Sequence, residues 1–467
     1  MNTLKFNQLV LGLGVIAAIV TTSCQDQLLD TPQPELQGSA AAAPEVTLSG
    51  FLTTRTLDRD TVYILDEFVR VPSGQILTIE SGTLIKGITG TLSGNPATGT
   101  PPGTLVIERG GKIEAVGTST APIVFTSNET VPASGDWGGV IILGKAPICY
   151  NGTAEIEGIP SSATGDNGYG GVDDADNSGT LQYVRIEYAG NVLVDGDEIN
   201  GLTLGGVGSG TTIDHVQVTH GLDDGFEFFG GTVNASYLIA SYNKDDDFDT
   251  DQGYSGHIQF AVSLRDPSVF SSFPTGGFES NGDEDTYSGC NLTNATFSNF
   301  TVIGPIKYNV GTAVNAAYNS GALIRDGSEL DIFNSIIVGY PNYQLELDVP
   351  AAFGSTVFAE GVTLVYPTFG VAHDGDSTNA PNFSASGFNN ECLNASISGS
   401  VNNNTLVKRS GLGVNAWAPT SILSFQPVTE KSSDLSSGLL TGFTAVGFRG
   451  AIGKTNTVNW NTGWEQF

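Results

Sequence analysis

Two segments of the chain repeat each other at a spacing of 22 residues, and both are rich in carboxylates. Residues 219–227 read THGLDDGFE and residues 241–249 read SYNKDDDFD, so their acidic positions coincide when aligned. A repeat of this length with short β-rich units is typical of a solenoid, whose neighbouring coils place equivalent residues about 4.8 Å apart. The sequence therefore predicts one crowded acidic edge, made of Asp223, Asp224, Glu227, Asp245, Asp246, Asp247, Asp249 and Asp251.

Carboxylate oxygens at adjustable spacing suit Ca²⁺, which takes about six to eight oxygen ligands in flexible geometry. We therefore expect calcium as the cofactor of this edge. Two roles remain open for the ion, which either takes part in a reaction or only holds two coils together. A third interpretation is a solvated acidic ridge without metal.

A polysaccharide lyase at such a site would also need a basic residue to take the C5 proton of a uronate. Lys244 is adjacent to the acidic run, but the acids around it would raise its pKa and keep it protonated. Arg265, about one coil later, and Arg185, on the preceding coil, are the other candidates.

His220 stands at the end of an expected strand, close to Asp223 and Asp224. A histidine beside carboxylates can serve in acid–base catalysis, as a glycoside hydrolase of this architecture would require. However, Tyr242 occupies the equivalent place one coil later and Tyr188 one coil earlier. The repeat therefore favours His220 as one step of an aromatic stack.

A second acidic segment, residues 174–179, reads DADNSG and has the beginning of a calcium loop. Its candidate ligands are Asp174, Asp176 and Ser178. The twelfth position is Arg185 instead of a bidentate Glu, so the segment is not an EF-hand. It is either a calcium site in a loop or an Asx-rich turn.

The composition limits the partners of the chain. It has 18 Lys and Arg against 49 Asp and Glu, and a formal net charge of -31. A nucleic-acid partner is excluded because the electrostatic footprint has the wrong sign. The 61 Gly, together with frequent Asn, Thr and Val, favour short strands and tight turns over helices.

The N-terminus has the pattern of an export signal. Residues 1–23 combine Lys5 with an apolar run at 9–20 that is too short to span a bilayer. The segment ending at Cys24 resembles a bacterial lipobox, which implies lipidation of that cysteine, and residues 25–27 resemble the sorting tag of Bacteroidetes surface lipoproteins. The alternative is an ordinary secretory signal with an incidental cysteine.

Residues 24–45 are rich in Pro and Ala and are expected to form a flexible tether, which could reach about 70 Å when stretched. The expected location is therefore the outer face of the outer membrane, with the chain anchored to the membrane by lipid and not inserted in it.

From about residue 46 the pattern is that of strands and turns. Short segments such as 75–79, 82–87 and 104–107 alternate apolar and polar residues between Gly or Pro turns, three segments to a unit. This pattern predicts an all-β fold, a right-handed parallel β-helix, over residues 46–410, with insertions near 160–180, 190–200, 265–290 and 375–392. Residues 411–467, with Trp417, Trp460 and Trp464, are expected to cap the last coil, because an open solenoid exposes an apolar end.

Several motifs resemble a family of Bacteroidetes surface lipoproteins with the pectin-lyase-like β-helix fold. They are WGGVIILGKAP at 137–147, the acidic block at 223–227, FRGA at 448–451 and WNTGW at 460–464. The resemblance covers nearly all of the mature chain and implies the fold, not an activity.

The block at 223–227 also resembles the Asp-Asp-Gly-Phe-Asp calcium motif of some β-helical pectate lyases. In those enzymes, aspartates from neighbouring coils hold calcium that bridges enzyme and uronate. Carried over, the resemblance implies Asp223, Asp224 and Glu227, or Asp245, Asp246 and Asp249, as ligands.

Three cysteines remain after Cys24, and an odd number allows at most one disulfide among them. Cys290 and Cys392 both lie in Asn-rich stretches and are the expected pair. The alternative is that these two and Cys149 are all buried and free.

Two functions of different classes follow. The first is a calcium-stabilised surface module that binds a polysaccharide or a surface protein, or that is structural. The second is a calcium-dependent polysaccharide lyase or, as a further option, a glycoside hydrolase acting on acidic polymer. Surface aromatics that could stack on sugar rings are Tyr150, Tyr169, Tyr254, Tyr287 and Trp137, although Trp137 is better explained as a packing residue.

Overall fold

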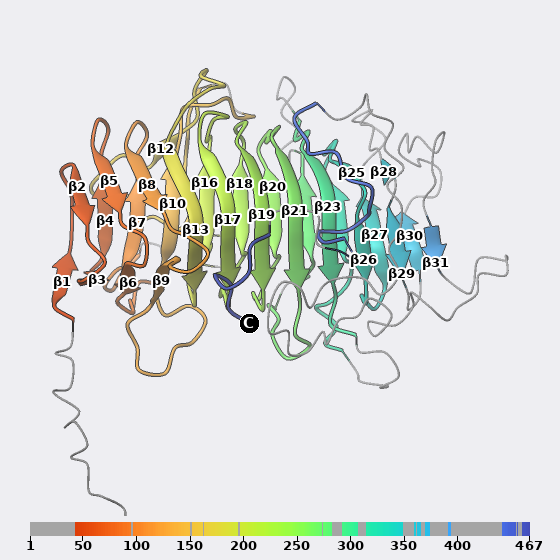
Figure 1. Ribbon diagram of the computed structural model, residues 1–467, viewed down its shortest axis with the longest axis horizontal. Helices are drawn as coiled ribbons and strands as arrows, with labels where there is room; N and C mark the ends of the chain where they lie inside the picture. The colour runs from red at the N-terminus through yellow and green to blue at the C-terminus, as the bar shows by residue number, and fades with distance from the viewer. Residues whose placement is uncertain are drawn as a thin grey trace, which may run out of the picture. The chain divides into compact units, whose positions relative to one another are not determined.

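The computed structural model describes residues 43–348 except 95–96, 150–151, 162, 195–196, 273, 283–291 and 307–313. It further describes residues 359–360, 362–365, 369–373, 391–393 and 441–467, the last without 454 and 456–459. The described chain is a stack of parallel strands (Figure 1). Within these residues, a helix long and apolar enough to cross a membrane is absent.

Each coil contributes three strands, and each strand pairs in parallel with its equivalent in the next coil. The first row contains β2 (Arg55–Leu57), β5 (Ile76–Ile79), β8 (Lys112–Val116), β25 (Asp331–Phe333) and β28 (Ala359–Glu360). The second row contains β1 (Glu45–Leu48), β3 (Val62–Leu65), β6 (Leu84–Gly87), β9 (Ile123–Ser127), β26 (Ile336–Val338), β29 (Thr363–Val365) and β31 (Glu391–Leu393).

In the middle coils the first and second rows merge into five longer strands. These are β13 (Gly179–Glu187), β17 (Thr212–Thr219), β19 (Asn234–Ser241), β21 (His257–Leu264) and β23 (Thr296–Ile303). The third row forms a separate sheet of β4 (Phe68–Val71), β7 (Thr104–Ile107), β10 (Gly139–Leu143), β16 (Leu202–Gly205), β18 (Phe226–Phe229), β20 (Phe248–Asp251), β22 (Phe278–Asn281), β24 (Ala322–Arg325), β27 (Tyr343–Asp348) and β30 (Phe369–His373). The right-handed parallel β-helix predicted from the sequence is confirmed.

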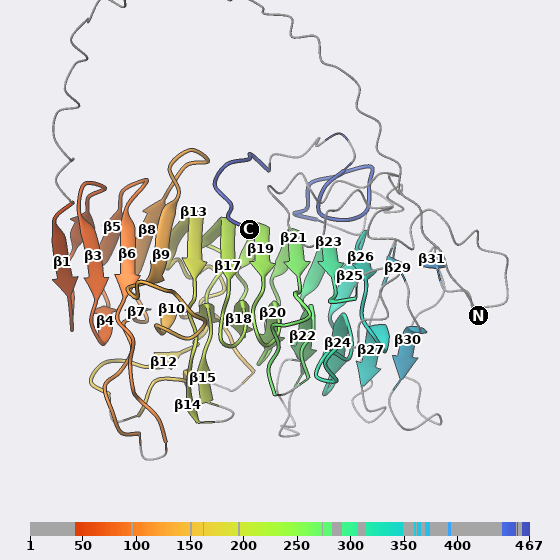
Figure 2. The same cartoon turned by 90° about the horizontal axis from the view of Figure 1, so that it is seen from below.

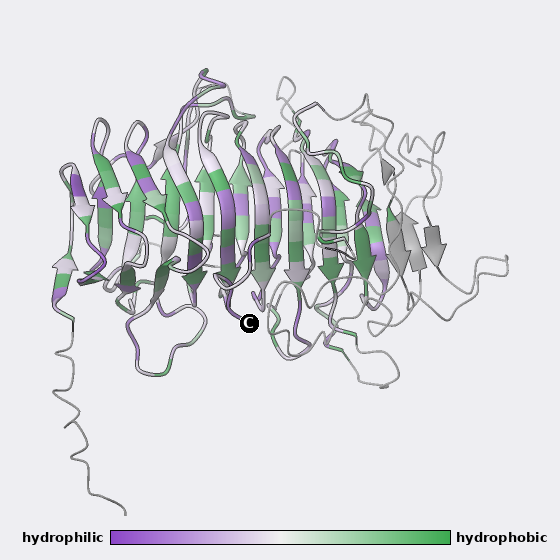
Figure 3. Ribbon diagram, viewed as in Figure 1, coloured by the Kyte–Doolittle hydropathy of each residue, from purple (hydrophilic) through white to green (hydrophobic). Residues whose placement is uncertain are grey.

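The alternation of apolar and polar residues explains how the coil closes, and Figure 3 shows it along the strands. In β17, the side chains of Ile213, Val216 and Val218 point into the core, and their register partners in β19 continue the same apolar stacks. Burying such stacks between three rows of strands removes apolar surface from water at about 25 cal/mol per Å².

A single residue with positive φ separates the two halves of each long strand. These residues are Tyr183 (50°), His215 (53°), Tyr237 (58°), Phe260 (63°) and Asn299 (59°). Non-glycine residues rarely adopt this conformation. Here it places two outward residues in succession, as in a bulge, so the strand turns a corner without leaving the sheet.

Two insertions cover the outer face of the third row. They contain the hairpins β11 (Ala154–Glu155) with β12 (Gly168–Tyr169), and β14 (Asn191–Val194) with β15 (Asp197–Ile199). Tyr169 and Ile199 pack on Ile141 of β10 and Phe229 of β18, and Figure 2 shows these hairpins beside the third-row strands. The outward positions of β16 and β18 are therefore shielded from solvent.

The C-terminal strap, residues 441–467, lies along the flank of the middle coils. Both backbone polar groups of Thr444 bond to Gln259 of β21, and the carbonyl of Gln466 accepts from Gln217 of β17. Trp460 and Trp464 are fully buried. We expected this segment to cap the last coil, but its described part covers a side of the helix, because its indoles bury against the outward aromatic residues there; Trp417 lies outside the described residues.

Cys149 forms a disulfide, so the alternative in which all three cysteines are free is wrong. The pairing of Cys290 with Cys392 stays a prediction. The side chains of Cys290 and Cys392 lie outside the described residues. The Asn-rich context that suggested their pairing carries no information on distance. Cys149 is instead placed by its backbone N–H, which bonds to the carbonyl of Gln252 at the end of β20.

Candidate functional site

The two acidic segments occupy equivalent turns in adjacent coils, as the repeat predicted. Phe226 pairs in register with Phe248, and their buried rings stack with centroids 5.1 Å apart. Because neighbouring residues on a strand point to opposite faces, Glu227 and Asp249, which also pair, lie on the outer side. A Cβ on Gly225 would lie 2.6 Å from Asn243 Nδ2, so only glycine fits between the two turns.

The carboxylates form two overlapping triads. Asp223, Asp224 and Asp245 each offer one oxygen, and these atoms lie within 4.8 Å of one another. Asp224, Glu227 and Asp249 form a second triad with the same limit. Asp224 is common to both. Each triad combines residues from two neighbouring coils, so a bound cation would cross-link the turns that precede β18 and β20.

Burial and mutual repulsion raise the pKa of all five carboxyl groups. For Asp245 the pKa is raised to about 6, mainly by burial, with Arg265 opposing the shift. Burial also raises the pKa of Asp223, and Asp245 adds to the effect. The pKa values of Asp224 and Glu227 lie well above the ordinary range for the same primary reason. Without protons or a cation, this cluster is a costly concentration of like charge.

Several buried oxygens at the site have no hydrogen-bond donor within the described structure. Asp245 Oδ1 and Asp249 Oδ1 are two of them. A third is Thr203 Oγ1, and Thr203 is the register partner of Glu227 on β16. Buried polar atoms are normally paired, so these oxygens favour a ligand that supplies positive charge. The donor set fits calcium, which binds carboxylate and other oxygen atoms.

Asp247 lies in the same acidic run but has a different role. Its oxygens accept from Ser263 Oγ at 2.6 Å, Asn243 Nδ2 at 2.9 Å and Arg265 Nη1 at 3.0 Å. Asp247 and Arg265 are both fully buried. Burial alone would lower the pKa of Arg265, but Asp247 outweighs it and raises that pKa. Asp247 is therefore the counter-ion of Arg265, and its oxygens do not belong to either triad.

Asp246 and Asp251, also expected as ligands, are held by backbone groups. The N–H of Asp246 donates to Asp224 Oδ1 at 2.8 Å, and Asp246 Oδ1 accepts from the N–H of Gly276. Asp251 Oδ1 accepts from the N–H of Gln252. The side chain of Asp246 thus links its turn to the next coil, and the backbone N–H of Asp246 fixes the position of the Asp224 carboxylate.

Two of the three basic candidates are engaged by other groups. Arg265 is held in its buried ion pair with Asp247. Arg185 bonds to Glu187 at 2.9 Å and to the carbonyl of Trp464 at 3.3 Å, so it faces the C-terminal strap on another sheet. Lys244 is partly buried, and its backbone carbonyl accepts from Arg265 at 3.2 Å. Arg265 lies one coil after Lys244, as the sequence indicated, whereas Arg185 on β13 lies two coils before Lys244 and one coil before Asp223. The sequence could not say which face each side chain occupies.

Residues 50–411 match a family described as the pectate-lyase-like β-helix domain. The chain belongs to this family. Comparison with curated proteins gives no match. Among solved structures, the Dettilon tailspike protein (gp208) is similar, with 11% sequence identity and a TM-score of 0.25. The alignment covers 70% of this chain and 61% of the tailspike chain, so the chain spans less than two thirds of that protein.

In this pectate-lyase-like β-helix, His220 is a step of an aromatic stack, as the repeat favoured. Its ring centroid lies 5.0 Å from that of Tyr188 and 5.1 Å from that of Tyr242. All three residues have positive φ, so they terminate equivalent strands in the same way. His220 Nδ1 pairs with the hydroxyl of Thr219 at 2.9 Å, and burial lowers the pKa of the ring.

The acidic loop before β13 matches the Asx-rich alternative better than a calcium site. Asp176 is buried and accepts from Ser178 Oγ at 3.1 Å, while Asn177 Oδ1 accepts from the N–H of Gly179. The carbonyl of Asp174 accepts from Ser209 at 2.9 Å. Among the described residues, the triads of possible ligands do not include this loop.

The aromatic residues proposed for sugar stacking are internal where they are described. Tyr169 and Tyr254 are fully buried. Trp137 is a packing residue, as expected, with its indole 6.4 Å from the ring of Phe125 and its N–H on the carbonyl of Glu187. Tyr150 and Tyr287 lie outside the described residues.

Three acidic residues near the triads were missed at the sequence level. Glu279 pairs in register with Asp249 and raises its pKa, while Glu157 and Glu198 act on Glu227 and Asp223. Glu279 follows Phe278 as Glu227 follows Phe226. This repeated Phe–acid pattern is the signal in the sequence from which Glu279 could have been predicted. The insertion between β21 and β22 lengthens the repeat and hides the signal, and the other two lie in the inserted hairpins.

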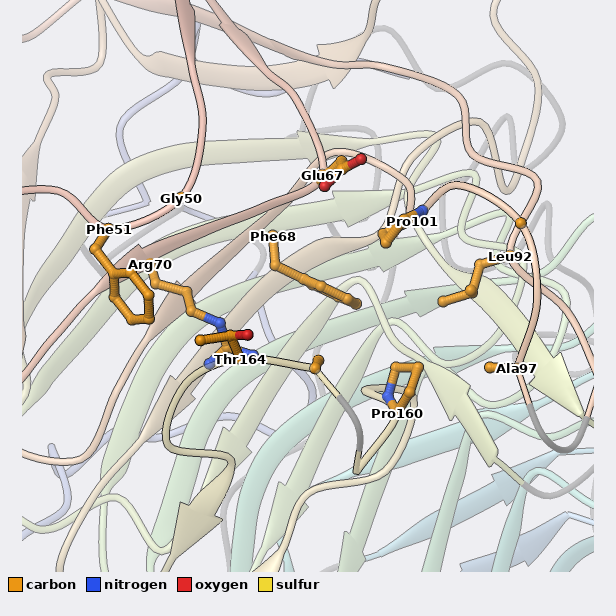
Figure 4. A pocket seen from close by; sticks show the side chains of 12 residues that line it. Gly50, Phe51, Glu67, Phe68, Arg70, Leu92, Ala97, Pro101, Pro160 and Thr164 are labelled. Carbon is orange, nitrogen blue, oxygen red and sulfur yellow. The ribbon is translucent and has the colours of Figure 1, made fainter.

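A cavity of about 420 Å³ lies on the outside of β4, under the loops at 91–101 and 160–164 (Figure 4). Phe68, Leu92, Pro101 and Pro160 give it apolar walls, and Arg70 is at its edge. The guanidinium of Arg70 bonds to Glu108 at 3.0 Å and to Asn167 at 2.8 Å. Arg70 therefore joins the inserted loop to the coil.

Proposed function

We propose that this chain is a cell-surface lipoprotein whose β-helix binds calcium at the two triads and serves as a surface module for binding glycan. The observation that carries the calcium assignment is the pair of triads sharing Asp224, with buried oxygens of Asp245 and Asp249 left without a donor. A cation supplies the missing partner and offsets the repulsion that raises the pKa values.

The ion has a structural role in this proposal. Each triad takes ligands from two successive coils, so calcium adds a link along the axis of the stack. Coils of a solenoid contact only their neighbours, and each such link contributes directly to the stability of the array. Backbone bonds already fix the turns, since the N–H of Gly225 donates to the carbonyl of Asp246 at 2.9 Å.

The proposed anchor is Cys24, followed by a tether that reaches to the first strand at Glu45. The lipobox-like segment and the acidic tag support export and lipidation in a Bacteroidetes-type cell. With a net charge of -31, the body of the chain is repelled by anionic headgroups. The lipid and the tether therefore hold it at the surface but away from the bilayer.

A calcium-dependent lyase is the second candidate. Lys244 supports it, because this residue directly precedes Asp245 in the turn between β19 and β20. The engagement of Arg265 with Asp247, and of Arg185 with the strap, leaves Lys244 as the base to be tested. The surface module requires no base and is preferred for that reason.

Calorimetric titration of calcium into the metal-stripped full-length protein tests the proposal. We expect binding with roughly micromolar or tighter affinity. Asp245→Ala/Asp249→Ala should abolish it, since each substitution removes a ligand from one triad. Asp60→Ala/Glu80→Ala is the matched control, because it removes the exposed Asp60 and the partly exposed Glu80 from an early coil, far from the triads, and should bind calcium as the parent does.

Absence of binding, or binding that Asp245→Ala/Asp249→Ala leaves unchanged, would refute the calcium site. The lyase is tested with calcium and polygalacturonate, by the absorbance of unsaturated products near 230 nm. If unsaturated products form and Lys244→Met abolishes them while calcium affinity is retained, the chain is a lyase and the proposal of a non-enzymatic surface module is wrong.

A further inference from the structure

A groove of about 450 Å³ lies on the outer face of β17, β19 and β21, in the first half of each strand. It belongs to a different sheet from the triads, which lie on β18, β20 and the turns before them. Its described lining is mostly polar and includes Gln182, Asp214, Asn234, Ser236 and His257. Its position and chemistry are therefore independent of the calcium site.

The floor of the groove is a ladder that repeats once per coil. Gln182, Asp214 and Ser236 are in register on successive strands. Gln182 Nε2 donates to Asp214 Oδ1 at 3.0 Å, and Ser236 Oγ donates to Asp214 Oδ2 at 2.9 Å. The steps are about 4.8 Å apart, a spacing similar to the length of one pyranose residue in a chain.

The C-terminal strap closes one end of the groove. Gln259 holds Thr444 through two bonds of 2.8 Å, and Phe443 lies against His257 with ring centroids 4.5 Å apart. Tyr237 supplies a half-buried aromatic edge and stacks between His215 and Phe260 at 4.4 and 5.1 Å. Because both faces of this ring are covered, Tyr237 offers the groove only a rigid apolar edge beside the hydrogen-bonding groups.

The charge of the groove selects among glycans. The described residues that line it include one carboxylate, Asp214, and lack Lys and Arg. Asp214 already accepts bonds from Gln182, Ser236 and His215. Burial lowers the pKa of His257, which favours the neutral ring. A polyanion would find no counter-charge here, whereas hydroxyl groups would find both donors and acceptors.

We propose that this groove binds an uncharged linear glycan, laid along the axis of the β-helix with about one sugar residue per coil. The inference rests on the proposed function, a surface module that binds glycan, and adds to it the class of glycan and the surface that binds it. Calcium at the triads stabilises the coils but is not a ligand of this sugar.

Microcalorimetry with the full-length protein, with calcium and with EDTA, tests the inference. The probes are cellohexaose, xylohexaose, mannohexaose and, as the acidic comparator, hexagalacturonate. We expect a neutral hexasaccharide to bind in both conditions. Ser236→Trp and Thr212→Trp fill the groove from neighbouring coils and should each weaken binding more than tenfold. Thr78→Trp, an outward residue in an early coil of the same sheet, is the matched control and should bind as the parent does.

The outcomes separate this inference from the calcium site. Neutral glycan binding that Ser236→Trp or Thr212→Trp abolishes supports the groove, whether or not calcium binds. Binding of none of the neutral probes overturns it, even when calcium titration succeeds. Binding that both groove variants retain overturns the groove as the sugar site. Binding that is restricted to hexagalacturonate and lost in Asp245→Ala/Asp249→Ala also overturns the groove, and it places the sugar site at the triads.

Discussion

Three consecutive aspartates show how environment decides the role of a residue. Asp245 keeps a buried oxygen without a donor, Asp246 receives the N–H of Gly276, and Asp247 neutralises Arg265. Their side chains differ only in the direction that the turn gives them. Carboxylates that face buried cations or backbone donors are already satisfied. Those that face each other need protons or a metal ion, so their protonation is linked to folding and, in the proposed function, to calcium.

We expect the stability of the metal-free protein to fall as the pH rises from about 4 to above 6. The unfolded chain releases these protons near pH 4, whereas the folded cluster retains them to higher pH, with a pKa of about 6 for Asp245. Protons therefore stabilise the folded state below about pH 4, and this contribution is lost as the pH rises through the folded pKa values. Calcium replaces the protons, so its effect on Tm should be larger at about pH 8 than at about pH 5.

Thermal unfolding at both pH values, with calcium and with EDTA, checks this expectation. The control is Asp245→Asn/Asp249→Asn, which keeps the shape of the side chains but removes two charges. It should reduce both the pH dependence and the calcium effect. A calcium effect on Tm that is the same at both pH values would contradict the linkage between the ion and the raised pKa values.

At the level of elements, the C-terminal strap is the part that ties distant coils together. It contacts β21 through Thr444, β23 through Phe448 and β17 through Gln466. A solenoid otherwise gains stability only between neighbours. By crossing several coils, the strap makes their opening cooperative, and it also forms one end of the groove.

Trp460→Ala should destabilise the middle coils, because the fully buried indole packs on Tyr237 at 5.3 Å and donates to the carbonyl of Ala451 at 2.9 Å. A Trp-to-Ala change in a core costs about 3–5 kcal/mol. Hydrogen exchange measured by mass spectrometry should show faster exchange in β17 and β19. Strands β3 and β6 serve as the internal control and should keep their protection, while uniform loss in all coils would refute the local role of the strap.

At the level of the whole molecule, residues 43–467 form one compact unit, and the proposed signal and most of the tether precede it. Anchoring and folding are therefore expected to be separable. The strands begin at Glu45, which is the last residue of the tether expected from the sequence. The proposed lipid anchor would in this way carry the β-helix without any part of residues 43–467 entering the membrane.

Replacement of Cys24 by Ala tests this separation in a bacterial host that lipidates exported proteins. We expect loss of palmitate labelling and of membrane fractionation, because the acylated side chain is removed. The Tm and the calcium affinity should not change, since both belong to residues 43–467. Membrane association that persists in Cys24→Ala would show that another segment provides the anchor.

The sequence by itself determined the architecture and the location of the acidic site. Alternating apolar residues between glycine turns require parallel coils, and the 22-residue repeat placed Glu227 on Asp249 and His220 between two tyrosines, as the register and the ring stack confirm. These features are local or periodic, so each coil repeats the same physical solution and the sequence displays it directly.

Only the tertiary structure decided which carboxylates face one another and which are satisfied. Arg265 and Ser263, which bind Asp247, and Gly276, which binds Asp246, come from the following coil. Glu157 and Glu198 come from insertions without a period. The position of the strap and the disulfide of Cys149 also depend on contacts between segments far apart in sequence. Such contacts are set by the direction of side chains and by the packing of surfaces, which residue types and spacing do not encode.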